Sequence, residues 1–412
     1  MFRQKIFRTE LSNGITVLTD WMPHAYSANV GVWIPRGSRH ETKEINGLAH
    51  FYEHLVFKGT EKRSAFEIAH TIEDRGGNLE AYTTRQETGF YAQVMREDVP
   101  LAVDVIADML MNPTFDSKEM EKERKVIIEE VHSYDDIAEE CAGDLFNALH
   151  YKGCGLSLPI AGTAKTVKGL LKSGMLEYER QVLEDLPLTV CASGAVDHEK
   201  LVELVEKNFE KKKSAKHPFV YLYRANAGQK EKSKEELSQS NLFWGTSFDA
   251  SEGSVEFLRA LGLFNVAFGA DMGSRLFQKI REERGLAYSV YSMTDVYTDV
   301  FGWGISLATA PQKMDLALSL AQKELEKFLK NGFEKGELER TKMNVVGGLR
   351  IGADNAEKRL MRLADQELHL GKIFTMAETE KQVLAFDEER LMELLRNAFE
   401  HAPFATAIVK PK

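Results

Sequence analysis

The sequence predicts an α+β fold, an α/β sandwich of two duplicated domains in which each domain packs a mainly antiparallel sheet against helices. Strand-like and helix-like patterns alternate along the chain, and their order recurs after a polar stretch near the middle. The 412 residues, 43% of them hydrophobic, are enough to form two cores. We expect pseudo-two-fold symmetry to relate the two domains.

The first half begins with a hairpin signal. Asn13-Gly14 separates two apolar runs, and this dipeptide favours the tight turn that joins two antiparallel strands. A further strand, a short apolar helix closed by Gly59, two more strands and two helical patterns follow. The expected strands are residues 6–11, 15–18, 28–34, 78–83 and 89–95, and the expected helices are residues 47–57, 99–110 and 117–150.

A polar stretch at about residues 211–240 is the best candidate for a linker. After it the order of elements recurs, with strands expected at residues 241–248, 286–293 and 300–308, an apolar helix at residues 255–268, and long helices at the end. We therefore divide the chain into an N-terminal domain, a linker and a homologous C-terminal domain. The expected bounds are residues 1–215, 216–238 and 239–412.

Local sequence supports the duplication. NPTFDSKEMEKERKVIIEE in the first half resembles NGFEKGELERTKMNVVGG in the second half when Phe115 is placed on Phe333. Glu130 then falls on Gly348, and the apolar helix of the second half contains no histidine. A metal site that uses these residue types therefore belongs to the N-terminal domain, and the C-terminal domain lacks it.

Composition and charge narrow the functional classes. The formal net charge of -10 argues against a nucleic-acid partner, because phosphate binding needs a clustered basic face. No run of about 18 uncharged apolar residues occurs, and the N-terminus has no signal-peptide core, so we expect no membrane partner and a cytoplasmic location. Cys141, Cys154 and Cys191 form no CxxC pair, which favours a reducing compartment and argues against thiolate zinc ligands.

The segment HFYEH, residues 50–54, is the clearest chemical signal and lies in a predicted helix. At about 100° per residue, His50, Glu53 and His54 share one face of that helix. Two neutral imidazoles at this spacing suit a tetrahedral zinc, and a carboxylate that does not easily reach the metal is free to take a proton from bound water. The same pattern also arises by chance or decorates a helix surface.

A catalytic zinc needs a third protein ligand and one open position. Carboxylates for this role occur in the predicted helix that contains ERKVIIEE. Glu123 and Glu130 are seven residues apart and therefore share a stripe of that helix with Ile127. The ordinary alternative is an exposed charge run, which is our interpretation of Glu121 and Glu129.

HFYEHLVFKGT and the ERKVIIEE helix together resemble the insulinase and pitrilysin family of zinc peptidases, the inverzincins, in its two-domain branch of bacterial and mitochondrial processing peptidases. The resemblance covers nearly the whole chain and includes RGSRHE, GGNLEAYTTRQET, NPTF and SRLFQKIREERGLAYSVYS. It implies that His50, His54 and Glu130 bind Zn2+. It also implies that Glu53 is the general base and that Glu123 is an assisting carboxylate next to the ligands.

The resemblance further implies residues that bind a peptide substrate. Family members use an Arg and a Tyr seven residues apart to hold the substrate backbone and the developing oxyanion, and these correspond here to Arg281 and Tyr288. Without the resemblance, Arg281 is interpreted as an ordinary cation at the end of a helix and Tyr288 as an ordinary tyrosine in a strand. Glu80 and Ala81 lie in a strand whose edge can pair with an extended peptide. Glu80 stands where the family usually has Asn, so a preference for basic substrate residues and a merely solvated charge both stay open.

The sequence thus predicts a zinc-dependent metalloendopeptidase that cleaves peptides or unfolded segments. Family members that resemble this chain enclose a chamber built from four such domains, which implies a dimer here. A homodimer contains every part of the site, and a heterodimer with a homologous subunit stays open. The alternative is a non-catalytic core-type assembly subunit of the same fold; such subunits tend to lose metal ligands, so the complete motif argues against it.

Overall fold

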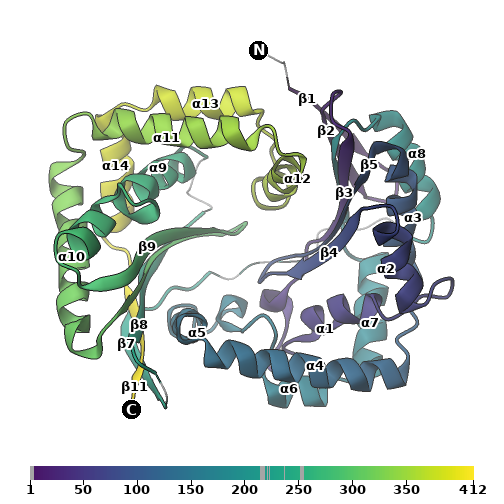
Figure 1. The fold of residues 1–412 in the computed structure, drawn as a ribbon, viewed down its shortest axis with the longest axis horizontal. Helices are drawn as coiled ribbons and strands as arrows, with labels where there is room; N and C mark the ends of the chain where they lie inside the picture. Colours follow the sequence, from purple (N-terminus) through teal and green to yellow (C-terminus); the bar gives the residue numbers. More distant parts are fainter. Residues whose placement is uncertain (1–3, 214–218, 220, 222, 236, 251–254) are drawn as a thin grey trace. The chain divides into compact units, whose positions relative to one another are not determined.

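The computed structural model describes residues 4–213, 219, 221, 223–235, 237–250 and 255–412. The chain forms two compact units, each with its own sheet and helices (Figure 1). The first unit comprises Met1–His132, Leu158–Val220 and Gly352–Thr375, and the second comprises Ser133–Ser157, Tyr221–Ile351 and Met376–Lys412. Among the described residues, no helix is long and apolar enough to cross a membrane.

The first unit contains a six-stranded sheet of order β1-β2-β6-β3-β5-β4. Its neighbours are antiparallel except for β2 and β6, so the predicted mainly antiparallel sheet is confirmed. The hairpin predicted at Asn13-Gly14 joins β1 to β2. The strands are β1 (Lys5–Glu10), β2 (Thr16–Trp21), β3 (Ser27–Ile34), β4 (Asn78–Thr83), β5 (Thr88–Met95) and β6 (Thr189–Gly194).

Helices cover both faces of the first sheet (Figure 1). The larger core lies under α1 (Leu48–Val56), α2 (Ala65–Glu73), α3 (Val99–Met111), α4 (Ser117–Asp136), α7 (Lys172–Glu184) and α8 (His198–Asn208). On the other face Trp33 and Tyr91 pack against Leu360 of α12 (Ala356–Asp365). Arg359 of α12 also forms an ion pair with Asp20 of β2. Alternation along the strands thus supplies apolar side chains to two separate cores.

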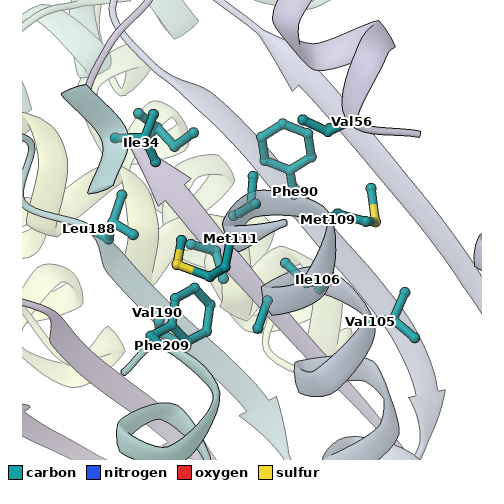
Figure 2. Packing of buried hydrophobic residues seen from close by; sticks show 14 of the residues in the cluster. Ile34, Val56, Phe90, Val105, Ile106, Met109, Met111, Leu188, Val190 and Phe209 are labelled. Carbon is teal, nitrogen blue, oxygen red and sulfur yellow. The ribbon is translucent and has the colours of Figure 1, made fainter. Parts of the chain in front are cut away.

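Figure 2 shows how α3 packs on this sheet. Ile106 and Met109 of α3 meet Ile34, Phe90 and Val190, which come from three neighbouring strands. All five side chains are at most 1% exposed. α3 therefore covers this face of β6, β3 and β5.

Phe90→Ala is expected to lower the free energy of unfolding of the first unit by about 3–5 kcal/mol, because it removes a fully buried ring and leaves a cavity. Urea unfolding followed by circular dichroism measures the effect. Phe66→Ala is the control, since Phe66 is 66% exposed and its removal is expected to cost about 0.5 kcal/mol or less. Equal midpoints for the two variants would contradict the assignment of Phe90 to the core.

The second unit contains a five-stranded sheet of order β7-β11-β8-β10-β9, in which β7 and β11 form the parallel pair. This order repeats β2-β6-β3-β5-β4 of the first sheet position by position, including the parallel pair. The predicted duplication is therefore confirmed at the level of topology. The strands are β7 (Gly228–Lys234), β8 (Ser240–Asp249), β9 (Ala287–Val296), β10 (Val300–Thr309) and β11 (Ala405–Pro411). Their main core lies under α9 (Val255–Asn265), α10 (Met314–Asn331), α11 (Glu337–Gly352), α13 (Met376–Ala385) and α14 (Glu388–Phe399).

Each unit also includes a helix from the other half of the sequence. α5 (Ala138–His150) packs on the second sheet, on the face opposite its main core, and α12 does the same on the first sheet. The alignment that places Phe115 on Phe333 also places Ala138 on Ala356, the first residues of α5 and α12. The exchanged helices are therefore equivalent elements of the two duplicated halves.

The structure differs from the sequence-based expectations at three places. The continuous helix predicted over residues 117–150 is wrong, because extended backbone at Ile137 separates α4 from α5. The bounds 1–215 and 239–412 follow sequence order and do not capture the exchange of α5 and α12. The expected linker, residues 216–238, contains β7, which is paired to β11; its residues 216–218, 220, 222 and 236 lie outside the described residues.

Candidate metal centre

α1 carries the HxxEH residues and is held in place by its apolar face. Phe51 and Leu55 are at most 1% exposed and belong to the larger core of the first unit. His50, Glu53 and His54 occupy another face, as the helical period predicts. The ring centres of the two histidines are 4.6 Å apart.

Glu130 of α4 completes a cluster of three potential metal ligands. Its Oε1 lies 3.7 Å from Nε2 of His50, and its Oε2 lies 3.6 Å from Nε2 of His54. The three ligand atoms lie within 4.8 Å of one another, and in the described part of the chain no other group of three or more His, Cys, Asp or Glu does so. Ligands held about 2.0–2.2 Å from one tetrahedral zinc lie about 3.3–3.6 Å apart. The donor set and its spacing therefore fit a single zinc ion.

Glu123 orients the second histidine. Its Oε1 lies 2.9 Å from Nδ1 of His54, and its Oε2 lies 2.7 Å from Nζ of Lys58. Burial acts to lower the pKa of His54, but the Glu123 hydrogen bond and the charges of Glu53 and Glu130 outweigh it and raise the pKa. A carboxylate that accepts Nδ1–H leaves Nε2 free as a metal ligand, and Nε2 is the atom that faces Glu130.

His50 lies in a drier environment. Burial, followed by the neighbouring His54, lowers the pKa of His50 to about 4, against the opposing effect of Glu130. This imidazole is therefore neutral at pH 7, as ligation requires. Its Nδ1 is buried and has no hydrogen-bond partner among the residues that the structure describes.

Glu53 lies next to the cluster without being part of it. Thr83 of β4 donates a hydrogen bond from Oγ1 to Oε2 of Glu53 at 2.5 Å. Burial raises the pKa of the Glu53 carboxyl, while the Thr83 hydrogen bond and the nearby His54 act in the opposite direction. A carboxyl group with a raised pKa suits proton transfer near neutral pH.

Among the strands that the structure describes, β4 is the last of its sheet and has β5 as its one neighbour, so its outer edge offers backbone groups that can pair with another strand. Ala81 faces the larger core, as does the side of β4 from which Thr83 reaches α1. Glu80 lies on the opposite face, where it accepts hydrogen bonds from Tyr91 at 2.5 Å and from Asn78 at 2.7 Å. The structure thus gives the Glu80 carboxylate partners within its own sheet, and its selection of basic substrates stays a prediction.

Arg281 and Tyr288 belong to the second unit. Arg281 lies in the π-helical turn Phe277–Glu282, and its Cζ is 5.5 Å from the centre of the Tyr288 ring. Gly285, between them, has a φ of 55°, which ends the helix and starts the path into β9. Tyr288 is 76% exposed, so its hydroxyl is accessible. The structure brings the two side chains together, and their contact with a substrate stays a prediction.

Thr83 and Lys58 are not among the site residues predicted from the sequence. Lys58 follows His54 by four residues, so helical spacing is the signal that places it on the same side. Thr83 follows Ala81 by two residues along a strand, so strand alternation is the signal that turns it toward α1. Neither signal identifies a partner, because Glu123 and Glu53 come from other elements.

Glu123→Ala is expected to lower zinc affinity by about 10- to 100-fold, because His54 loses the group that fixes its ring and tautomer. Competition with a chromophoric chelator measures the affinity. Glu121→Ala is the matched control on the same helix, since Glu121 is exposed and pairs with Arg124. Unchanged affinity in Glu123→Ala would show that His54 needs no such support.

Comparisons with known proteins agree with this geometry. Residues 16–164 match the family model described as insulinase (peptidase family M16), and this range includes all three potential ligands and Glu53. Residues 176–345 match the model described as the peptidase M16 inactive domain. The second match covers most of the C-terminal half, whose apolar helix contains no histidine.

Individual relatives align over nearly the full chain. The uncharacterized zinc protease YmxG of Bacillus subtilis is 33% identical over 407 residues, which cover 98% of each chain. The mitochondrial-processing peptidase subunit beta of Lentinula edodes is 32% identical over 413 residues, which cover 96% of this chain and 88% of its own. The crystal structure of a protease from Helicobacter pylori matches 100% of both chains with a TM-score of 0.91 at 19% identity, which shows a shared fold.

Proposed function

Since the chain belongs to the insulinase family of peptidases, family M16, we propose that it is a zinc-dependent metalloendopeptidase that cleaves peptides or unfolded segments. The observation that carries the proposal is the cluster of His50, His54 and Glu130 with Glu53 beside it. The cluster supplies three protein ligands of the kinds that a catalytic zinc uses, and Glu53 supplies the base.

The chain's own residues define the chemistry. His50, His54 and Glu130 would hold the zinc ion, which would supply an acidified water and polarise a carbonyl group. Glu53 takes a proton from the attacking water and returns it to the leaving amine, while Thr83 holds the Glu53 carboxylate in place. The outer edge of β4 pairs with the extended substrate, which brings a peptide bond alongside Thr83 and Glu53. Arg281 and Tyr288 are the proposed further donors to the substrate backbone.

Cleavage of an unstructured peptide pool tests the function. The purified chain is expected to produce internal cleavage products by mass spectrometry, to lose this activity after chelation, and to regain it on addition of one equivalent of zinc. The alternative, a non-catalytic assembly subunit, predicts no products at any zinc level. The complete set of ligands and base argues for the peptidase.

The proposal includes a homodimer in the cytoplasm. The four-domain chamber expected for this family needs two chains of two domains, and this chain contains both the metal cluster and the Arg281/Tyr288 pair. Sedimentation velocity is expected to give twice the mass of one chain. A fully active monomer would contradict the chamber, and activity that appears only with a second, homologous subunit would favour a heterodimer.

A further inference from the structure

The N-terminus of α1 is capped by a buried carboxylate from outside the helix. Gly47 is the N-cap residue and has no side chain with which to accept the free N–H groups of the first turn. Glu41 accepts them instead, from Gly47 N–H at 2.7 Å and from Ala49 N–H at 2.7 Å. Its third hydrogen bond comes from Nδ2 of Asn46 at 3.0 Å. Glu41 is 7% exposed, so water does not replace these contacts.

The segment that carries Glu41 is itself attached to the turn between β4 and β5. Ser38 N–H donates to the Thr84 carbonyl at 3.3 Å, and Arg39 N–H donates to the Arg85 carbonyl at 2.8 Å. A Cβ at Gly37 would lie 2.2 Å from the Thr84 oxygen, so the close approach requires glycine at this position. The same turn follows Thr83, the residue that holds Glu53.

We propose that Glu41 is a positioning residue of the metal centre: it fixes the first turn of α1 and thereby the imidazole of His50. Ala49, whose N–H Glu41 accepts, directly precedes His50. Nδ1 of His50 has no hydrogen-bond partner among the described residues, so no hydrogen bond at that atom shares with the first turn the task of orienting this ring. Glu123 supports His54 directly, and Glu41 supports His50 through the helix. The inference rests on the proposed zinc centre.

Glu41→Gln tests the inference, because the amide keeps the size of the side chain but weakens the acceptor and places an NH2 group against N–H donors. The expected result is about a tenfold loss of zinc affinity in chelator competition, at the low end of the range for groups that orient metal ligands. The visible absorption spectrum of the cobalt-substituted protein is expected to change as well, because it reports ligand geometry. Measurements at pH 8 compare the carboxylate form, since burial raises the pKa of Glu41 to about 7.

Asp197→Asn is the matched control. Asp197 caps α8 of the same unit by accepting the Lys200 N–H at 3.1 Å, away from the metal helix. This variant is expected to change neither the zinc affinity nor the cobalt spectrum. If Glu41→Gln behaves like Asp197→Asn in both readouts, Glu41 is a stabilising residue only and the inference is wrong.

Asn46→Ala covers the case in which Glu41→Gln does not fold. It removes one of the three donors to Glu41 and leaves the two backbone hydrogen bonds, so a smaller loss of zinc affinity in the same direction is expected. Unchanged affinity in a folded Asn46→Ala would then overturn the inference. Failure of the unaltered chain to bind zinc at all would instead overturn the proposed function on which it rests.

Discussion

Glu53→Gln is expected to lower kcat by about 10²- to 10⁴-fold while zinc remains bound at one ion per chain. The amide has nearly the same shape as the carboxylate but takes no proton from water, so general base catalysis is lost. Glu53 is outside the ligand cluster, which is why metal content is expected to stay unchanged.

Peptide cleavage kinetics and elemental analysis of the same preparation measure the two quantities together. Thr83→Val is an informative companion, because it removes the hydroxyl that orients Glu53 and leaves the carboxylate present. Its expected effect is a smaller fall in kcat. Near-normal turnover in a zinc-loaded Glu53→Gln would remove Glu53 from the role of base.

Glu130→Gln is expected to lower zinc affinity more than 100-fold, beyond the range seen for groups that only orient ligands. The substitution replaces an anionic ligand by a neutral amide and leaves two imidazoles as the strong donors. Zinc content after dialysis against a chelator measures the effect, and activity is expected to fall in proportion to occupancy.

Glu129→Gln provides the control for this variant. Glu129 is the neighbouring residue on α4 and is exposed, so the same chemical change there is expected to leave zinc content and activity unchanged. Full occupancy in Glu130→Gln would mean that the third ligand comes from another residue. Equal loss in both variants would point to a general effect of charge on this helix.

The sequence predicts which helices carry the site residues better than it predicts how those helices pack against each other. Helical spacing alone places His50, Glu53 and His54 on one face, because that arrangement is local to α1. The position of Glu130 relative to them depends on how α4 packs against α1, and family resemblance rather than spacing indicated it. The separations of 3.6 and 3.7 Å between Glu130 and the two imidazoles are a product of tertiary structure.

The groups that support the site are less visible in the sequence. Glu41 is the last residue of the RGSRHE segment, and the neighbouring sequence does not indicate that its side chain caps the helix that begins several residues later. Lys58 directly follows the helix predicted at residues 47–57, although its side chain pairs with Glu123. Such contacts join segments that are far apart in the sequence or irregular, so periodicity does not identify the partner of either residue.

The main differences between the predicted and the observed fold also arise from contacts between segments that are far apart in the sequence. The helical pattern that continues through Ile137 predicts one helix, whereas the chain is extended at this residue and α5 packs on the second sheet. The polar residues of Gly228–Lys234 favour a linker in the sequence. They form a strand in the structure, because an exposed edge strand needs few apolar residues. Its pairing with β11 is long-range and leaves no local signal.

The central claim is that one zinc ion is held by side chains from α1 and α4. Diffraction data collected on either side of the zinc absorption edge, from crystals of the zinc-loaded protein, test it directly. One anomalous peak is expected at about 2.0–2.2 Å from Nε2 of His50, Nε2 of His54 and a carboxylate oxygen of Glu130. A strong peak elsewhere in the chain, with these three side chains free of metal, would contradict the claim.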